Sequence, residues 1–383
     1  MSYDVAALRR AEFPWAAAGD TIYLNNASTG PLPERTVRVV DEWNRLRANP
    51  ERISHDLQFA TLARGRELIA RLIGADAGEI ALATNTSFGI NLAAFSLPLR
   101  AGDVVVSPDL EFPANVYPWM QLAKRRGIEY RRVACPDGVL DSATLARVLD
   151  DDRVRAVTVS WVQFASGARV DLAALGAACR ERGVFFVVDA IQGLGPLTID
   201  LQTTPVDIFA CGAQKWLLSP WGAAFVYVRR PLIDQLEPHD VSWLAVRNAD
   251  DFSRLTDYEL AWRSDARRFE FITLPYQDVA GMNASLELLH ELGPRAVAAH
   301  ASRLADAIID WAAGRDDVRL VTPRDASRHA AIVSLQPADA ARASARLTRD
   351  GVAHSLREGA IRLSPHCYNT SAEVRQALDV MAG

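Results

Sequence analysis

The feature that most constrains the fold is an alternation of short apolar runs with longer helical patterns. A short apolar run between turn signals is typical of a strand buried on both faces, and helices between such strands act as crossovers. We therefore expect an α/β fold with a mainly parallel, seven-stranded sheet that helices cover on both faces. The expected strands are 80–83, 104–107, 129–133, 156–161, 184–189, 207–211 and 223–228, and the clearest helical patterns between them are 113–126 and 171–182.

The pattern changes twice along the chain. The last two expected strands have no helix between them, which predicts one antiparallel strand. After about residue 280, long helices at 278–292 and 295–313 are followed by short strands at 331–335 and 360–364 around a helix at 338–350. We expect a large domain at 19–280 and a small α+β domain made of 1–18 and 281–383.

Composition narrows the functional classes. The 383 residues are 49% hydrophobic and 23% charged, with a net charge of -5. These values are typical of a globular protein and argue against nucleic acid or an anionic membrane as a partner. The four cysteines are scattered, so no metal site is indicated. With no signal peptide and no membrane-spanning run visible, we expect a cytoplasmic protein.

Two residues indicate the chemistry. Asp189 ends the apolar run Phe185-Phe186-Val187-Val188, and Lys215 lies in a Gly-containing turn after the expected strand 207–211. An Asp at one strand end and a Lys near another suit a pyridoxal phosphate site, in which Asp holds a proton on the pyridine nitrogen and Lys forms the Schiff base. On these two residues alone, an Asp cap and a surface Lys are about equally plausible.

A candidate anion site lies upstream. The segment Thr84-Asn85-Thr86-Ser87 follows an expected strand and opens an expected helix. Hydroxyls and unpaired backbone N–H groups at a helix N-terminus favour binding of a phosphate. A plain N-cap is the commoner role for such residues, so this signal is weak by itself.

Together these segments resemble the class V aminotransferase family, pyridoxal phosphate enzymes of fold type I that include cysteine desulfurases, kynureninase and isopenicillin epimerase-like proteins. The resemblance runs from Tyr23-Leu24-Asn25-Asn26-Ala27 to Tyr368-Asn369-Thr370, and its most specific part is the block from Asp189-x-x-Gln192 to Gln214-Lys215. It implies a transferase fold with pyridoxal 5'-phosphate as cofactor.

The resemblance also implies a role for each matching residue. Lys215 would be the catalytic residue that holds the cofactor and moves the Cα proton. The remaining cofactor contacts would be Asp189 at the pyridine nitrogen, Gln192 beside the ring hydroxyl, Phe112 on the ring face, and Thr86, Ser87 and Gln214 at the phosphate. Thr273 would reach the phosphate of a neighbouring subunit, which implies a homodimer with shared active sites.

Substrate binding is implied for two residues. Asn26 and Arg362 match positions that contact the amino acid, and Arg362 would bind its α-carboxylate. A planar guanidinium suits a carboxylate because it offers two parallel hydrogen bonds. Without the resemblance, a surface Arg at a strand end would be the more ordinary interpretation of Arg362.

Several positions depart from the desulfurase pattern. The stretch 347–360 is short and holds no cysteine, whereas desulfurases carry a reactive Cys just before the carboxylate-binding Arg. Trp161 stands where they place an Asn, and Gly212 where many relatives have a phosphate-binding Ser. Cys367 follows the Arg instead of preceding it. Core packing explains Trp161 as well as a site role does, and Cys211 reads as a small buried hydrophobe.

We therefore expect a pyridoxal phosphate-dependent aminotransferase acting at Cα of an amino acid or amine. A carbon–sulfur or carbon–carbon lyase of the cysteine desulfurase, cysteine lyase or kynureninase type is the alternative, followed by an epimerase. A cofactor-free binding protein on the same fold is the non-enzyme alternative. The sequence does not identify the side chain of the substrate.

Overall fold

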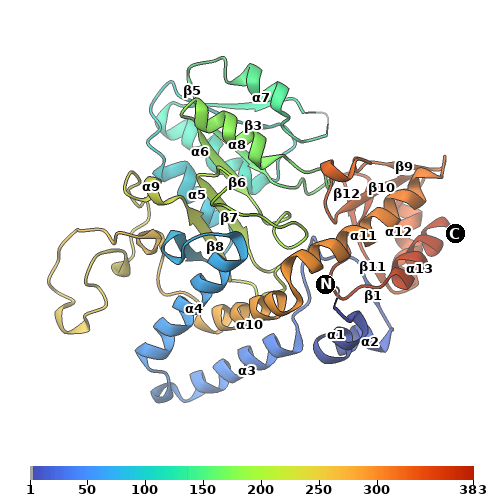
Figure 1. Ribbon diagram of the computed structural model, residues 1–383, viewed down its shortest axis with the longest axis horizontal. Coiled ribbons are helices and arrows are strands. Elements are labelled where there is room, and N and C mark those ends of the chain that lie inside the picture. The colour runs from blue at the N-terminus through green and yellow to red at the C-terminus, as the bar shows by residue number, and fades with distance from the viewer. Residues whose placement is uncertain (1–2, 136) are drawn as a thin grey trace.

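The computed structural model describes residues 3–135 and 137–383. Its centre is a seven-stranded sheet in the order β2-β8-β7-β6-β5-β3-β4 (Figure 1). Only β8 runs antiparallel to its neighbours, as the missing helix before it predicted. The predicted α/β fold class is thus confirmed. The strands are β2 (Ile80–Ala83), β3 (Val104–Pro108), β4 (Glu129–Val133), β5 (Val154–Ser160), β6 (Phe185–Asp189), β7 (Ile208–Gly212) and β8 (Ala224–Val228).

Helices cover both faces of this sheet, and alternate residues of each strand feed two separate cores. Phe209 and Cys211 of β7 belong to a cluster with α4, α7 and α8, whereas Ile208 and Ala210 pack with α5 and α6. This two-sided burial explains the continuous apolar strands. The helices of the large lobe are α3 (Glu34–Ala48), α4 (His55–Ile73), α5 (Thr86–Ser96), α6 (Tyr117–Arg126), α7 (Ser142–Val148), α8 (Leu172–Glu181), α9 (Arg230–Ile233) and α10 (Tyr276–Leu292).

A smaller lobe holds a second sheet in the order β12-β13-β10-β9, drawn in orange and red in Figure 1. Its core is a third cluster of buried side chains from this sheet and the C-terminal helices. The lobe contains α11 (Pro294–Ala313), β9 (Val318–Leu320), β10 (Val333–Pro337), α12 (Ala340–Arg349), β11 (Val352–Ala353), β12 (Ser355–Arg357), β13 (Ala360–Leu363) and α13 (Ser371–Ala382).

The N-terminal segment joins the two lobes. The short helices α1 (Val5–Glu12) and α2 (Pro14–Ala18) precede β1 (Ile22–Tyr23), which pairs in parallel with β11 of the small lobe. The loop after β1 then passes the carboxyl ends of the large sheet. The division into domains at 19–280 stays a prediction, since β1 forms its pair with the C-terminal lobe.

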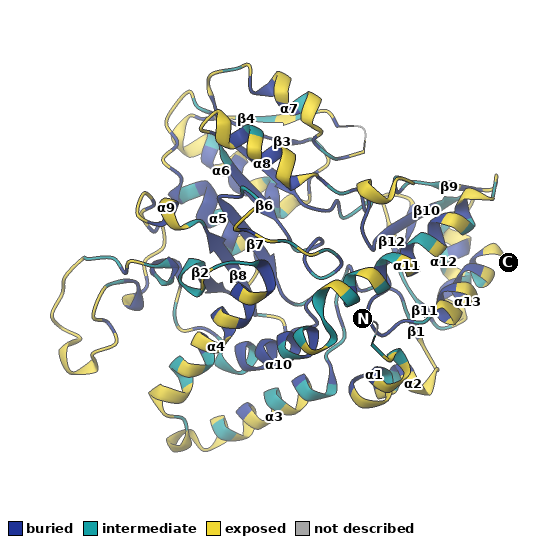
Figure 2. Cartoon of the chain, in the orientation of Figure 1, coloured by how far each residue is buried: buried dark blue, intermediate teal, exposed yellow. Residues whose placement is uncertain are grey.

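Residues 239–271 leave the large lobe as an extended excursion, which is the exposed loop at the left of Figure 2. Its apolar side chains include Tyr258, which is 89% exposed, and Leu260, which is 76% exposed. Among the described residues, no helix has the length and apolar character that crossing a bilayer requires.

Candidate functional site

The candidate site lies at the carboxyl ends of the parallel strands, where open α/β sheets bind their ligands. Lys215 occupies the turn after β7, and the loop that follows β1 crosses directly over it. The Gly30 N–H donates to the Gln214 carbonyl at 2.9 Å. A Cβ on Gly30 would lie 2.1 Å from the Lys215 carbonyl oxygen, so only glycine allows this close crossing.

Burial dominates the electrostatics of Lys215. The pKa of the Lys215 amine is lowered to about 8, mainly by burial; the charge of Asp189 opposes this shift and the charge of Arg362 adds to it. About a tenth of this amine is therefore uncharged at pH 7, and about half at pH 8. A neutral amine is a nucleophile and a base, which an ordinary surface lysine is not.

Asp189 ends β6 and is only 2% exposed. One of its carboxylate oxygens accepts the Ile191 N–H at 3.0 Å. Burial raises the pKa of Asp189 to about 6, although this hydrogen bond and the Lys215 charge oppose the shift. A buried carboxylate with so few partners is suited to receive a cationic N–H group.

The residues predicted to bind an anion lie at the start of α5, next to the turn that follows β7. Asn85 caps α5 by accepting the Phe88 N–H, which leaves the N–H groups of Thr86 and Ser87 without acceptors inside the helix. The Thr86 hydroxyl accepts the Gly212 N–H at 2.9 Å. A Cβ on Gly212 would meet the Gln214 side-chain oxygen at 2.5 Å and the Thr86 hydroxyl at 3.1 Å, so these polar groups gather around Gly212.

Phe112 forms one side of the site. The Lys215 Nζ lies 5.8 Å from the centre of its ring, and the Phe164 ring meets it edge-on at 5.2 Å. Phe112 is 43% exposed, so its ring is available to a ligand.

Sequence reasoning missed Glu111, the residue before this ring. Its buried carboxylate accepts the Ser160 N–H at 2.7 Å, the Ser160 hydroxyl at 2.5 Å and the Gln163 amide at 3.2 Å. Burial raises the pKa of Glu111 to about 7. These bonds tie the Phe112 segment to the end of β5. An acidic residue beside the expected aromatic was the only available sequence signal.

Arg362 is buried on β13 and points toward the same site. Its Nη1 donates to the Phe164 carbonyl and its Nη2 to the Ser28 hydroxyl, both at 2.8 Å. Its Nε is buried without a hydrogen-bond partner in the described chain. A carboxylate bound side-on would use Nε together with Nη2. Ser28 and Phe164 therefore orient the guanidinium, and no sequence pattern had singled out either residue.

Two residues predicted to contact the substrate or the cofactor form hydrogen bonds within the protein. The Asn26 amide donates to the Lys215 carbonyl at 3.2 Å, and its oxygen accepts the Tyr368 hydroxyl at 3.0 Å. Gln192 donates to the Ala27 carbonyl and accepts the Trp216 indole N–H. Both residues hold the segment around Lys215 in place. Their direct contact with substrate or cofactor stays a prediction.

Thr273 lies on the exposed segment before α10, and no hydrogen bond within the described residues links its side chain to Lys215. The flanking Phe271 and Leu274 line a hollow of about 320 Å³ with Thr84 and Phe88, beside the start of α5. The predicted role of Thr273 toward a neighbouring subunit stays untested by a single chain.

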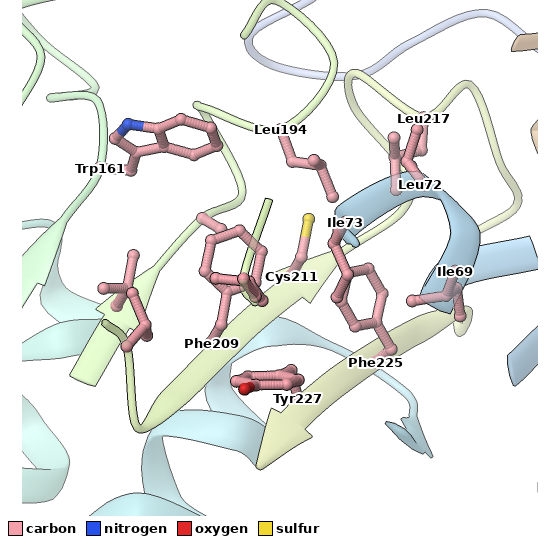
Figure 3. Packing of buried hydrophobic residues seen from close by; sticks show 14 of the residues in the cluster. Ile69, Leu72, Ile73, Trp161, Leu194, Phe209, Cys211, Leu217, Phe225 and Tyr227 are labelled. Carbon is pink, nitrogen blue, oxygen red and sulfur yellow. The ribbon is translucent and has the colours of Figure 1, made fainter. Parts of the chain in front are cut away.

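Three further residues belong to the interior. Trp161 and Cys211 are part of the core beneath the sheet, where Trp161 packs near Phe209 (Figure 3). A Cβ on Gly193 would meet the Trp161 ring at 2.4 Å, which fixes the indole there. Cys367 is fully buried, and burial raises its thiol pKa. This thiol is neither accessible nor ionised near neutral pH.

The residues gathered at this site match the functional groups of one kind of ligand. Asp189 can face a protonated ring nitrogen, Lys215 an aldehyde, and the start of α5 a phosphate. The chemistry of this donor set therefore matches a phosphorylated pyridine aldehyde. Arg362 places a guanidinium on the opposite wall, which is formed by the loop after β1 and the small lobe.

Known proteins are similar over nearly the whole chain. A "Probable cysteine desulfurase" of Methanothermobacter thermautotrophicus is 28% identical over 390 residues, covering 95% of both chains. The "Isopenicillin N epimerase" of Streptomyces clavuligerus is 31% identical over 381 residues, covering 94% of this chain and 95% of its own.

Solved structures agree in fold. A C-DES mutant with glycine covalently linked to its PLP cofactor superposes with a TM-score of 0.88 at 21% identity, covering 98% of each chain. The family model of aminotransferase class V matches residues 22–377. The chain therefore belongs to the class V aminotransferase family.

Proposed function

We propose that this protein is a pyridoxal phosphate-dependent enzyme that acts at Cα of an amino acid, as an aminotransferase. The observation that carries the proposal is the buried Lys215 amine, with its pKa lowered to about 8, between the Asp189 carboxylate and the Arg362 guanidinium. Family membership and the fit of the donor set support the same cofactor. When bound, pyridoxal phosphate stabilises negative charge that develops at the substrate Cα.

The residues that would hold the cofactor come from four strand ends. Asp189 would pair with the ring nitrogen, and Phe112 would lie against one ring face. The phosphate would receive N–H groups from the start of α5 together with the Thr86 and Ser87 hydroxyls and the Gln214 amide. Gln192 and Asn26 would position the loop over Lys215.

Arg362 and Lys215 would then have different roles toward the substrate, one in binding and the other in proton transfer. Arg362 would bind the α-carboxylate through Nε and Nη2, which fixes the orientation of the Cα–H bond. Lys215 would accept the Cα proton and return it to a neighbouring carbon. A base with a pKa near 8 suits proton transfer near neutral pH.

A lyase that eliminates a β-substituent is the second candidate, favoured by the relatives named cysteine desulfurase. The same two residues would serve it. A route through a catalytic cysteine is not supported, because the hairpin before Arg362 contains none and Cys367 is buried. An epimerase remains the third candidate, as one relative carries that name.

Cofactor attachment can be tested sharply, since the sequence contains only two lysines, Lys124 and Lys215. Borohydride reduction of the holoenzyme followed by peptide mapping should place a pyridoxyl group on Lys215. Lys124 is exposed at the end of α6, so Lys124→Arg is a matched control that should keep the label. An unlabelled Lys215 in the purified, cofactor-loaded protein would refute the proposal.

The reaction type needs a separate measurement. With an amino donor alone, an aminotransferase should lose its absorption near 420 nm and release about one keto acid per site. A lyase would keep the band and release product through many turnovers. Sustained release of sulfide or ammonia from a single amino acid would replace the aminotransferase assignment with the lyase.

We also propose that the enzyme works as a homodimer in which Thr273 reaches the partner's cofactor phosphate. The exposed apolar residues of the 239–271 excursion support an interface on this side. Sedimentation should give twice the chain mass, and Thr273→Val should weaken cofactor binding. A monomer with full activity would contradict the proposal.

A further inference from the structure

The hairpin formed by β12 and β13 carries two arginines on one face. In its antiparallel register, Ser355 pairs with Arg362 and Arg357 pairs with Ala360. Residues directly opposite each other, and those two positions along, share a face of the sheet. Arg357 is therefore the diagonal neighbour of Arg362 on the same face, one step closer to the turn of the hairpin.

This shared face is the one that borders the candidate site. On the other face, Ile361 is fully buried in the core of the small lobe. On the shared face, the Ser355 hydroxyl donates to Asn25 at 2.7 Å and contacts the Ser28 hydroxyl at 2.9 Å, and Ser28 accepts from Arg362. The hairpin thus lies with its arginine face against the loop that crosses Lys215.

The two arginines have no carboxylate between them. Neither Arg357 nor Arg362 forms an ion pair in the part of the chain that the structure describes. Burial is the main cause of the lowered pKa of Arg362 and of Lys215, and the positive charge of Arg357 lowers both values further. Arg362 is buried and its Nε lacks a partner.

An anionic group bound to Arg362 would satisfy only part of this positive charge. Asp189 is the nearby anion, but in the proposed function it pairs with the cofactor ring. The Glu111 carboxylate is already held by Ser160 and Gln163. Arg357 is exposed and makes no hydrogen bond within the described chain, so its guanidinium is available to a ligand.

We propose that Arg357 binds a second acidic group, on the side chain of the substrate, and that the enzyme prefers amino acids with an anionic side chain, such as dicarboxylic amino acids. This inference rests on the proposed function, because it assumes that Arg362 holds the α-carboxylate. Arg357 would then determine specificity, and it would take no part in proton transfer.

Binding of unreactive acids to the yellow holoenzyme tests the proposal without turnover. Succinate and glutarate carry two carboxylates, and butyrate carries one on a chain of similar length. By isothermal titration calorimetry, the better dicarboxylate should bind about tenfold more tightly than butyrate. In Arg357→Gln this preference should disappear, while the Kd for butyrate should stay within about twofold of the wild type.

Arg319→Gln is the matched control, because Arg319 is an exposed arginine on β9 at the far edge of the same sheet. It should leave the preference unchanged, and Arg357→Lys should keep part of it. Kinetics should agree: kcat/KM for aspartate or glutamate should fall about tenfold in Arg357→Gln, with kcat/KM for alanine nearly unchanged.

Three outcomes would overturn the inference: equal binding of mono- and dicarboxylates by the wild type, a preference that survives in Arg357→Gln, or an equal loss for both ligands in that variant. Each outcome is informative when a separate, borohydride-reduced sample of the same enzyme carries the label on Lys215. Failure of the labelling would instead refute the proposed function, so the two failures are distinguishable.

Discussion

The floor of the site and its outer wall are built in different ways. The floor consists of Asp189 and Lys215 with the start of α5, all at the ends of strands in one sheet. The wall consists of Arg357 and Arg362 on the small lobe, connected to the floor by the loop after β1. Each floor residue lies within a few residues of the end of its own strand, whereas the wall depends on contacts between segments more than 300 residues apart.

The electrostatics differ as well. On the floor, burial shifts the pKa of an acid upward and of a base downward, which brings both near neutral pH. On the wall, burial surrounds a guanidinium that stays charged and lacks a counter-ion among the described residues. The floor is therefore suited to moving protons, and the wall is suited to holding anions.

The largest effect is expected at the floor. Lys215→Ala removes the amine that would hold the cofactor and move the Cα proton, so turnover should fall by at least about 10³-fold. Steady-state assays on cofactor-loaded protein check this, with Lys124→Arg as the control. Activity within about tenfold of the wild type would mean that the floor does not perform the chemistry.

The next effect is expected at the wall. Arg362→Ala should keep the yellow colour but lower kcat/KM for an amino acid by an amount equivalent to about 2–4 kcal/mol, since it removes a charged, two-pronged contact. The experiment combines absorption spectra with kinetics. Loss of the yellow colour together with activity would show that Arg362 is also needed for cofactor binding, so that the wall and the floor do not act independently.

Asp189→Asn should stabilise the apoprotein and impair the holoenzyme. Because burial raises the pKa of Asp189 to about 6 from 3.8, the charged carboxylate destabilises the fold fully above pH 6 and not at all below 3.8. The variant should thus be more stable at pH 7.5 by up to about 3 kcal/mol, and the gain should vanish towards pH 4.

Urea unfolding of both apoproteins at several pH values measures this difference. Asp316→Asn is a suitable control, as Asp316 is exposed and forms no ion pair among the described residues. A gain in stability that is independent of pH would contradict the electrostatic explanation.

The pH dependence of cofactor loading tests the floor directly. With a pKa near 8, the Lys215 amine is half neutral at pH 8, so the loading rate should rise about tenfold per pH unit below that value and level off above it. Stopped-flow absorption near 420 nm records the rate. A rate that still rises steeply between pH 8.5 and 10 would indicate an ordinary, exposed amine.

The smallest effect is expected for Cys367, which belongs to neither region. Cys367→Ala should leave kcat/KM within about twofold of the wild type and lower the free energy of unfolding by about 1 kcal/mol, because a fully buried side chain loses contacts. Turnover assays and urea unfolding check both values. Loss of sulfur-releasing activity in this variant would place Cys367 in the chemistry after all.

The sequence by itself determined the sheet and most of the floor. Strands buried on both faces require continuous apolar runs, and the seven expected runs correspond to β2–β8 with shifts of at most two residues. Asp189 and Lys215 follow such runs within a few residues, so their place at the sheet edge was fixed by local connection. The same holds for Thr86, since the helix it opens begins immediately after β2.

Only the tertiary structure decided the wall and the exact burial of each group. Nothing near Arg362 in the chain indicates that Ser28 and Phe164 would orient it, because those contacts span 334 and 198 residues. Asn26 and Gln192 match the family pattern, yet their hydrogen bonds go to the protein around Lys215. Nothing in the sequence around Arg357 indicates that it lies diagonally opposite Arg362, because the strand partner, and hence the shared face, is decided by packing across the fold.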